Sequence, residues 1–345
     1  MSETSLRNRV TSTVDLLDRP SHTWREAAEG GEANLTRHDS LLQAAGCMNA
    51  VELRQPVNPA TPASSLTVAC WNLERCKHVP ESAARLQGTG ADICLLTEMD
   101  LGMARSGNRH TTADLAHHLG MGYAFGVEFI ELGLGDRREQ AEHTGERNEA
   151  GLHGNAVATR FAIDRAALLP LDRGGMWYSP DGIDQRRIGG RMALAVRLCL
   201  AEPVWFVAVH YESRLFPHDR ERETAYLLRH VDELCGDDAV LVGGDFNCRA
   251  MADEGFDDAA LLDRPQEAEP MFARLAEAGF DWRACNTAQP TTRLHSWDDR
   301  KRMLKKIDWF FSRGLKPSAP RVIPAVAADG RTLSDHEIIV VTVSL

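Results

Sequence analysis

One strand-like run with a polar end constrains this chain more than any other stretch. Residues 240–242 (Val-Leu-Val) form a short apolar run rich in β-branched side chains, which is typical of a buried strand. The glycines at 243–244 allow a sharp turn or a close approach to a bound group. Asp245 and Asn247 follow two residues apart, so in an extended chain their side chains point the same way. The stretch predicts either a polar site on a rigid support or a plain Asx turn.

The same pattern recurs along the chain: an apolar run ends in a residue from the Asn, Asp, Glu and His set. These further positions are Asn72, Glu98, His210 and Asp308, and the pair Asp335-His336 precedes the strand predicted over 337–343. Carboxylate and carboxamide oxygens suit a hard cation such as Mg²⁺ or Mn²⁺. Zinc would require a closely spaced Cys and His set, which the sequence lacks. We therefore expect an oxygen-rich pocket that holds one or two such ions beside a phosphate.

Seven short motifs resemble the successive motifs of the endonuclease/exonuclease/phosphatase superfamily, the DNase I-like fold. They are Trp71-Asn72-Leu73, Leu96-Thr97-Glu98, Gly154-Asn155-Ala156, Val209-His210, Gly244-Asp245-Phe246-Asn247, Lys306-Ile307-Asp308-Trp309 and Ser334-Asp335-His336. They follow the family's order and span about residues 66 to 345. The resemblance implies an α/β fold: a four-layer sandwich of two facing mixed β-sheets flanked by helices, with the site at one edge.

The resemblance also implies roles for the residues that would bind the ion and activate water. Glu98 resembles the main metal ligand, and Asn72 and Asp335 would lie near the same ion. Asp245 resembles the residue that orients or deprotonates the attacking water. Asn247 would position this water or the phosphate.

A second group of roles concerns the phosphate itself. His336 resembles the histidine that contacts the scissile phosphate, with Asp308 as its carboxylate partner. His210 resembles a second phosphate-contacting histidine, and Asn155 an amide that lines the site. For substrate binding outside these motifs we name Arg191, Arg109 and Tyr211 as candidates; solvated surface charge is the plainer interpretation of most basic residues.

The charge and the cysteine content of the sequence limit the class of substrate and the cellular compartment that we expect. The formal net charge of the 345 residues is −11, whereas a tight, non-specific nucleic-acid binder usually carries a basic surplus. No run is long and apolar enough for a membrane span, and residues 1–10 do not resemble a signal peptide. The eight cysteines are scattered and fit reduced core thiols, so we expect a cytoplasmic protein.

The first 65 residues differ from the rest. Apolar spacing predicts helices over residues 6–17 and 35–45, and residues 56–65 read as a linker. We expect a helical N-terminal extension (1–65), available for a homodimer contact, and a catalytic domain (66–345). The charged, glycine-rich stretch 133–151 has no period and predicts a mobile loop that could cover the site.

Together these features predict a divalent-metal-dependent phosphoric ester hydrolase. A phosphodiesterase that acts on a small or medium substrate by in-line water attack fits best. A DNA or RNA nuclease and a phosphomonoesterase are alternatives within the same chemistry. An inactive binding or scaffold protein is the alternative from another class, and it predicts missing site residues, whereas every matched position is intact.

Overall fold

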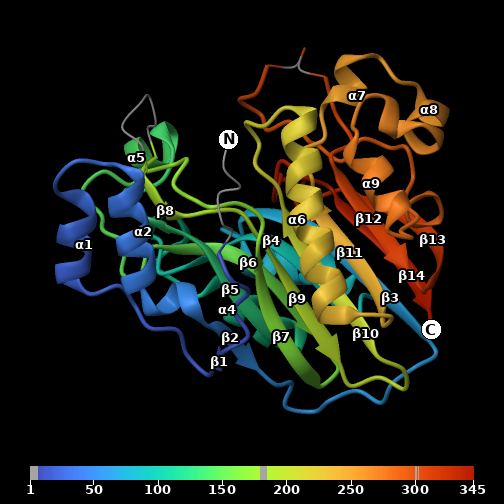
Figure 1. Ribbon diagram of the computed structural model, residues 1–345, viewed down its shortest axis with the longest axis horizontal. Helices are drawn as coiled ribbons and strands as arrows, with labels where there is room; N and C mark the ends of the chain where they lie inside the picture. Colours follow the sequence, from blue (N-terminus) through green and yellow to red (C-terminus); the bar gives the residue numbers. More distant parts are fainter. Residues whose placement is uncertain (1–6, 179–184, 300, 302) are drawn as a thin grey trace.

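Two β-sheets stack face to face between helices in the computed structural model, which describes residues 7–178, 185–299, 301 and 303–345 (Figure 1). The larger sheet has the strand order β1-β2-β5-β6-β4-β3-β14-β13, and β8 pairs with β5. Its strands are β1 (Thr13–Val14), β2 (Val51–Arg54), β3 (Ser65–Arg75), β4 (Ile93–Leu101), β5 (Gly122–Glu131), β6 (Leu152–Thr159), β8 (Arg187–Gly189), β13 (Lys316–Ile323) and β14 (Ile338–Ser344). The sheet is mixed, because β3 and β4 run parallel while β4 and β6 run antiparallel.

The smaller sheet has the order β12-β11-β10-β9-β7. Its strands are β7 (Ile163–Pro170), β9 (Met192–Leu198), β10 (Val204–His210), β11 (Ala239–Asp245) and β12 (Asp308–Arg313). Only β10 and β11 run parallel in it. Apolar side chains of both sheets form one buried cluster between them, including Val68 and Leu95 from one side and Phe206, Leu241 and Phe310 from the other. Burying this shared face is what holds the sheets together.

Helices cover both outer faces. On the larger sheet, α3 (Val79–Gln87) and α4 (Thr111–Leu119) pack Leu86 and Leu115 into a cluster with Trp71. On the smaller sheet, α6 (Pro217–Cys235) and α9 (Met271–Glu277) pack against the outer face of β10, β11 and β12. Periodic apolar positions such as Leu227 and Val231 give α6 its buried stripe. The predicted four-layer sandwich of two mixed sheets is confirmed.

The remaining helices are short or lie at the margins. They are α1 (His22–Glu29), α2 (Leu35–Ala44), α5 (Arg137–Glu142), α7 (Ala250–Asp253), α8 (Asp258–Asp263) and the 3₁₀ turns Gly46–Asn49, Ala104–Ser106, Pro265–Glu267 and Arg283–Cys285. In Figure 1, α1 and α2 stand beside the larger sheet at the end where β1 and β2 lie.

The helix predicted over residues 6–17 is wrong for the part that the structure describes. Residues 7–14 are extended: Val10 exchanges two backbone hydrogen bonds with Leu168 of β7, and Thr13 pairs with Val51 of β2. Both partners belong to sheet edges, whose unpaired backbone groups take up an added strand. These pairings outweigh the helical apolar spacing of this segment. The helix predicted over 35–45 is confirmed by α2.

The division of the chain at residue 65 stays a prediction, although β1 and β2 from the first segment belong to the larger sheet. Residues 133–151 are not wholly irregular, because α5 lies within them. Its N-cap Asp136 and its third residue Glu139 form a reciprocal capping box. Glu139 is buried by Arg75, Lys77 and Arg105, a set of contacts that local periodicity could not reveal.

None of the helices in the described ranges has the length and apolar character to cross a membrane. All eight cysteines are free, and seven of them are buried. A cytoplasmic location and a homodimer contact through residues 1–65 stay predictions.

Candidate active site

The site is built where strands of the two sheets end. In the smaller sheet, Asp245 at the end of β11 pairs in register with His210 of β10 and with Asp308 of β12. Three polar side chains are thereby aligned across three neighbouring strands. Gly244 allows this, because a Cβ there would lie 1.8 Å from the carbonyl oxygen of Val209. The glycine is required for the close approach of β11 to β10.

The larger sheet contributes Asn72 and Glu98 from the parallel strands β3 and β4. The register of both pairings of β4 shifts around Glu98, which has a positive φ of 57°. An irregularity of this kind re-aims a side chain at a strand end. Here it brings Glu98 Oε1 to 3.2 Å from Asn72 Nδ2, and the same nitrogen is 3.3 Å from Asp245 Oδ2 of the other sheet. Asn72 therefore joins the two sheets inside the site.

Two histidines complete the cluster around Asp245. Its Oδ2 atom lies 3.6 Å from His210 Nε2 and 3.7 Å from His336 Nε2. Asp335 Oδ1 is 3.9 Å from His336 Nε2. The structure thus brings together seven sequence-predicted residues. They are Asn72, Glu98, His210, Asp245, Asp308, Asp335 and His336.

His336 is held as a hydrogen-bond donor. Its Nδ1 atom lies 2.9 Å from Asp308 Oδ2, so Nδ1–H donates to that carboxylate. Burial opposes a charge on this imidazole, but the negative charges of Asp308, Asp245 and Asp335 raise the pKa of His336 well above its ordinary value. A protonated His336 directs its second N–H toward Asp245 and the space between the sheets.

His210 is oriented from behind by Arg191. A guanidinium nitrogen of Arg191 lies 3.1 Å from His210 Nδ1, and arginine can only donate, so Nδ1 accepts. In the neutral imidazole the hydrogen is then on Nε2, which faces Asp245. Arg191 is buried between Glu128, at 2.9 Å, and Glu212, at 3.0 Å. It lies behind His210 rather than on an exposed rim, a placement that the sequence did not indicate.

Glu98 contacts a residue that the sequence reasoning missed. Arg75 Nη1 touches Glu98 Oε2, and Arg75 Nε lies 3.3 Å from Glu139 Oε1. Burial opposes ionisation of Glu98, but Arg75 and then His210 lower its pKa well below the ordinary value. An arginine three residues after Asn72 was a signal in the sequence, but its direction depends on the left-handed backbone of residues 74–76.

The other predicted site residues also have partners outside the cluster. Asn247 donates from Nδ2 to the Tyr211 carbonyl at 2.9 Å, and its backbone N–H donates to Asp245 Oδ1 at 2.9 Å. Asn155 donates to the Met192 carbonyl at 3.0 Å, while its buried Oδ1 has no hydrogen-bond partner within the described residues. Tyr211 is fully buried, with its hydroxyl 2.9 Å from Thr224 Oγ1. Arg109 is exposed and pairs with Asp114.

The chemistry of the cluster fits a hard divalent cation. Asp245, Asp308 and His336 offer ligand atoms that all lie within 4.8 Å of one another. Because the neighbouring carboxylates favour the protonated form of His336 and its Nδ1 is bonded to Asp308, it is better suited to donate to an oxyanion than to ligate a metal. Asp335 and Glu98 add carboxylates on the other side of Asp245. Burial, and to a lesser extent the neighbouring charges of Glu74 and Glu98, raises the pKa of Asp335 to about 6 despite His336.

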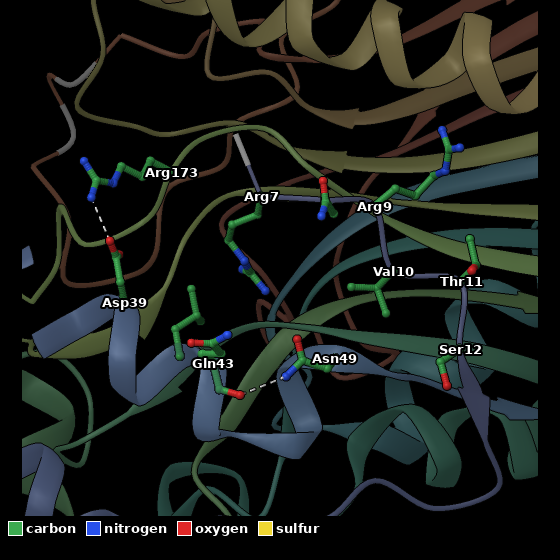
Figure 2. Close-up of a pocket in the computed structure, with 11 residues that line it drawn as sticks. Arg7, Arg9, Val10, Thr11, Ser12, Asp39, Gln43, Asn49 and Arg173 are labelled. Atoms are coloured by element: carbon green, nitrogen blue, oxygen red, sulfur yellow. Dashed lines mark hydrogen bonds and ion pairs between the residues drawn. The ribbon is translucent and has the colours of Figure 1, made fainter. Parts of the chain in front are cut away.

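A cavity of about 340 Å³ adjoins the cluster and is partly lined by Asp335 and His336. Arg249, Arg293 and Lys305 line it as well. Arg249 donates to Asn247 Oδ1 at 2.8 Å, and within the described ranges no carboxylate lies within 4.0 Å of its guanidinium. A larger cavity of about 730 Å³ is lined by none of the clustered residues (Figure 2). We place the chemistry at the smaller cavity, because the histidines and acids converge there.

Two loops meet beside this cavity. Trp297 stacks on His295 with ring centroids 4.2 Å apart, and the Arg138 guanidinium of α5 lies 3.7 Å from the Trp297 ring centroid. His295 Nε2 lies 2.7 Å from Glu74 Oε2, which also accepts the backbone N–H of Asp335 at 3.1 Å. The stack therefore connects α5 to the site through Glu74.

Comparisons with known proteins agree with this geometry. Residues 69–336 match the model of the Endonuclease/Exonuclease/phosphatase family. The fold is similar to an endonuclease/exonuclease/phosphatase from Beutenbergia cavernae, with a TM-score of 0.58, 19% identity and coverage of 82% of this chain and 72% of that one. It is also similar to a mannosyl-6-phosphatase from Bacteroides thetaiotaomicron, with a TM-score of 0.53, 16% identity and coverage of 81% and 100%. No curated protein sequence matches the chain.

Proposed function

Because the chain belongs to the endonuclease/exonuclease/phosphatase family, we propose that it is a Mg²⁺- or Mn²⁺-dependent hydrolase that cleaves a small or medium phosphodiester by in-line attack of water. The observation that carries the proposal is the convergence on one carboxylate, Asp245, of an amide and two histidines within 3.7 Å. General-base, oxyanion-binding and metal-binding groups are all within reach of one phosphate there.

In this proposal Asp245 accepts a proton from the attacking water, with Asn247 fixing the carboxylate through its backbone N–H. As the new P–O bond forms, the P–O bond to the leaving group breaks on the opposite side. His336, held by Asp308, donates a hydrogen bond to a phosphoryl oxygen as charge develops. His210, held by Arg191, donates a second one.

Glu98, Asn72 and Asp335 would hold the ion. When bound, it would neutralise charge on the phosphoryl group and polarise it. Asp245 contacts Asn72 of this group and also belongs to the set of Asp245, Asp308 and His336. It could therefore be a ligand in either set.

The cavity beside His336 supports a substrate that carries negative charge next to the scissile bond. Arg249 provides a guanidinium without a carboxylate partner in the described part of the chain. The net charge of −11 favours a small substrate over long duplex DNA.

A phosphomonoesterase is the second candidate. It is favoured by the similarity in fold to a mannosyl-6-phosphatase. That similarity, at 16% identity, leaves the choice of substrate to experiment.

The test is hydrolysis of bis(p-nitrophenyl) phosphate and p-nitrophenyl phosphate in parallel, with Mg²⁺, Mn²⁺ or EDTA, and plasmid nicking in the same buffers. We expect metal-dependent turnover of the diester, slower turnover of the monoester, and intact plasmid. Faster turnover of the monoester would replace the proposal with the phosphomonoesterase, and nicking at low protein concentration would replace it with a nuclease. No turnover with any metal would contradict it.

A further inference from the structure

The 730 Å³ cavity lies outside the catalytic cluster, between the extended N-terminal segment and α2. Residues 7–12 form one wall, α2 contributes Asp39 and Gln43, and Asn49 and Arg173 complete the polar lining. Figure 2 shows Arg7 pointing from the segment toward the space between Gln43 and Asn49. The volume is in the range of small-molecule sites.

Arg7 is a charged group whose charge is not matched locally. Within the described residues its guanidinium makes one hydrogen bond, from Nη2 to the Met48 carbonyl at 3.2 Å. Among residues 7–178, 185–299, 301 and 303–345, no carboxylate lies within 4.0 Å of it. Burial lowers the pKa of Arg7, and the more distant charges of Asp172 and Asp39 only partly offset this effect. A partly buried guanidinium without a near counter-charge is destabilising.

The other charges of the cavity are already balanced. Arg173 Nη2 lies 2.7 Å from Asp39 Oδ2 at the rim. Arg9 lies 3.4 Å from Glu233 and points away from the cavity in Figure 2. Among the described residues, Arg7 is therefore the cation of this cavity without a carboxylate partner, and one of its nitrogens is anchored by the Met48 carbonyl.

We propose that this cavity binds a small polar molecule through an anionic oxygen group, a phosphate or a carboxylate, that pairs with Arg7. The guanidinium keeps Nε and Nη1 for such a group, a geometry that suits a planar or tetrahedral oxyanion. The amides of Gln43 and Asn49 and the hydroxyls of Thr11 and Ser12 suit a polar body rather than an apolar one. The site gives the N-terminal segment a binding role that does not depend on the proposed hydrolase activity.

Isothermal titration calorimetry of the EDTA-treated full-length protein with AMP, succinate and adenosine tests whether the cavity binds an anion. We expect AMP or succinate to bind and uncharged adenosine not to bind; AMP alone identifies a phosphate group, and succinate alone a carboxylate. Arg7→Met should weaken binding by roughly tenfold or more, since a charge-assisted hydrogen bond is lost. Arg173→Met, at the rim, should weaken it less.

Two matched controls locate the ligand. Arg19 lies on the same N-terminal stretch as Arg7, but it is exposed and paired with the exposed Glu149. The Arg19→Met variant should therefore bind the anion as the wild type does. Asp245→Asn should also bind it as the wild type does. Unchanged binding in Arg7→Met, loss of binding in Asp245→Asn alone, equal binding of adenosine, or no binding of any probe would each overturn the proposal.

Discussion

Two neighbouring clusters of buried acids and histidines differ in how their charge is balanced. Glu98 belongs to the catalytic cluster, and Asp100, two residues further along β4, belongs to a cluster around Arg105. Asp100 Oδ1 lies 2.8 Å from Arg105 Nη2 and 2.8 Å from His153 Nδ1. Burial opposes its ionisation, but Arg105 and His153 lower the pKa of Asp100 to about 2.

Despite burial, Arg75 lowers the pKa of Glu98 as well, but the pKa values of Asp335 and Asp308 in the proposed catalytic cluster shift in the opposite direction. Burial and the charge of Glu74 and Glu98 raise the pKa of Asp335 to about 6. Asp308 likewise has a raised pKa, because burial outweighs the effect of His336. In the Arg105 cluster, positively charged side chains balance the carboxylates. In the proposed catalytic cluster, the carboxylates outnumber the positively charged side chains. The difference supports the proposal that the second cluster binds the cation.

The largest effect should follow from changing Asp245. Asp245→Asn removes the proposed proton acceptor, so kcat on bis(p-nitrophenyl) phosphate should fall by roughly 10²–10⁴-fold. The fold should remain, because the carboxamide retains an oxygen for the Asn247 backbone N–H. Steady-state kinetics with circular dichroism on the same sample measures both. Wild-type turnover in this variant would refute the assigned role.

In the neutralised cluster the effect should fall on stability. Arg105→Met leaves Asp100 buried without its arginine partner and should lower the free energy of unfolding by about 3–5 kcal/mol. Arg109→Met, four residues along, removes a half-exposed guanidinium and should change it by less than about 0.5 kcal/mol. Urea unfolding compares the two. Equal free energies of unfolding for Arg105→Met and Arg109→Met would mean that the Arg105 cluster does not stabilise the fold.

The pH dependence of Asp100 should be that of a stabilising carboxylate. Its pKa in the folded chain, about 2, is below the ordinary 3.8, so its contribution is present above pH 3.8 and lost as the pH falls through 2. Asp100→Asn should therefore be less stable than the wild type by about 2–3 kcal/mol at pH 7. The gap should narrow between pH 4 and pH 2 in urea titrations. A gap that is constant with pH would exclude the carboxylate charge as its origin.

Ionisation of Asp335 should lower the stability of the fold, whereas ionisation of Asp100 raises it, and the change in stability should be the smallest of those predicted. Its pKa in the folded chain, about 6, is raised above 3.8, so ionisation destabilises the fold as the pH rises through 6. Asp335→Asn should therefore be more stable than the wild type at pH 7.5 in EDTA. The gain should be less than about 1 kcal/mol, because the side chain is 39% exposed and solvent screens its charge. A loss of stability in EDTA would remove the distinction between the two clusters.

The strand-end pattern explains how much of the site could be predicted. His210 and Asp245 end β10 and β11, Asp308 begins the antiparallel β12, and register-matched strands bring these positions to one edge. Asn72 and Glu98 also follow apolar runs, although β3 and β4 continue beyond them to Arg75 and Leu101. These positions depend on local pattern and strand order, which a single sequence carries.

Long-range contacts explain what could not be predicted. Arg191 precedes β9, but nothing local indicates that it lies buried between Glu128 and Glu212. The extended N-terminal segment depends on the free edges of β2 and β7, which exist only once the sheets have formed. The inward direction of Glu139 depends on three cations, at positions 75, 77 and 105.

The most direct test of the contrast is calorimetric titration of Mn²⁺ into the metal-free wild type, Glu98→Gln and Asp100→Asn. The charge imbalance predicts that the wild type binds Mn²⁺, that Glu98→Gln binds it at least tenfold more weakly, and that Asp100→Asn, if folded, binds it as the wild type does. Equal affinity in the wild type and Glu98→Gln, or loss of binding only in Asp100→Asn, would contradict the assignment of the catalytic cluster as the cation site.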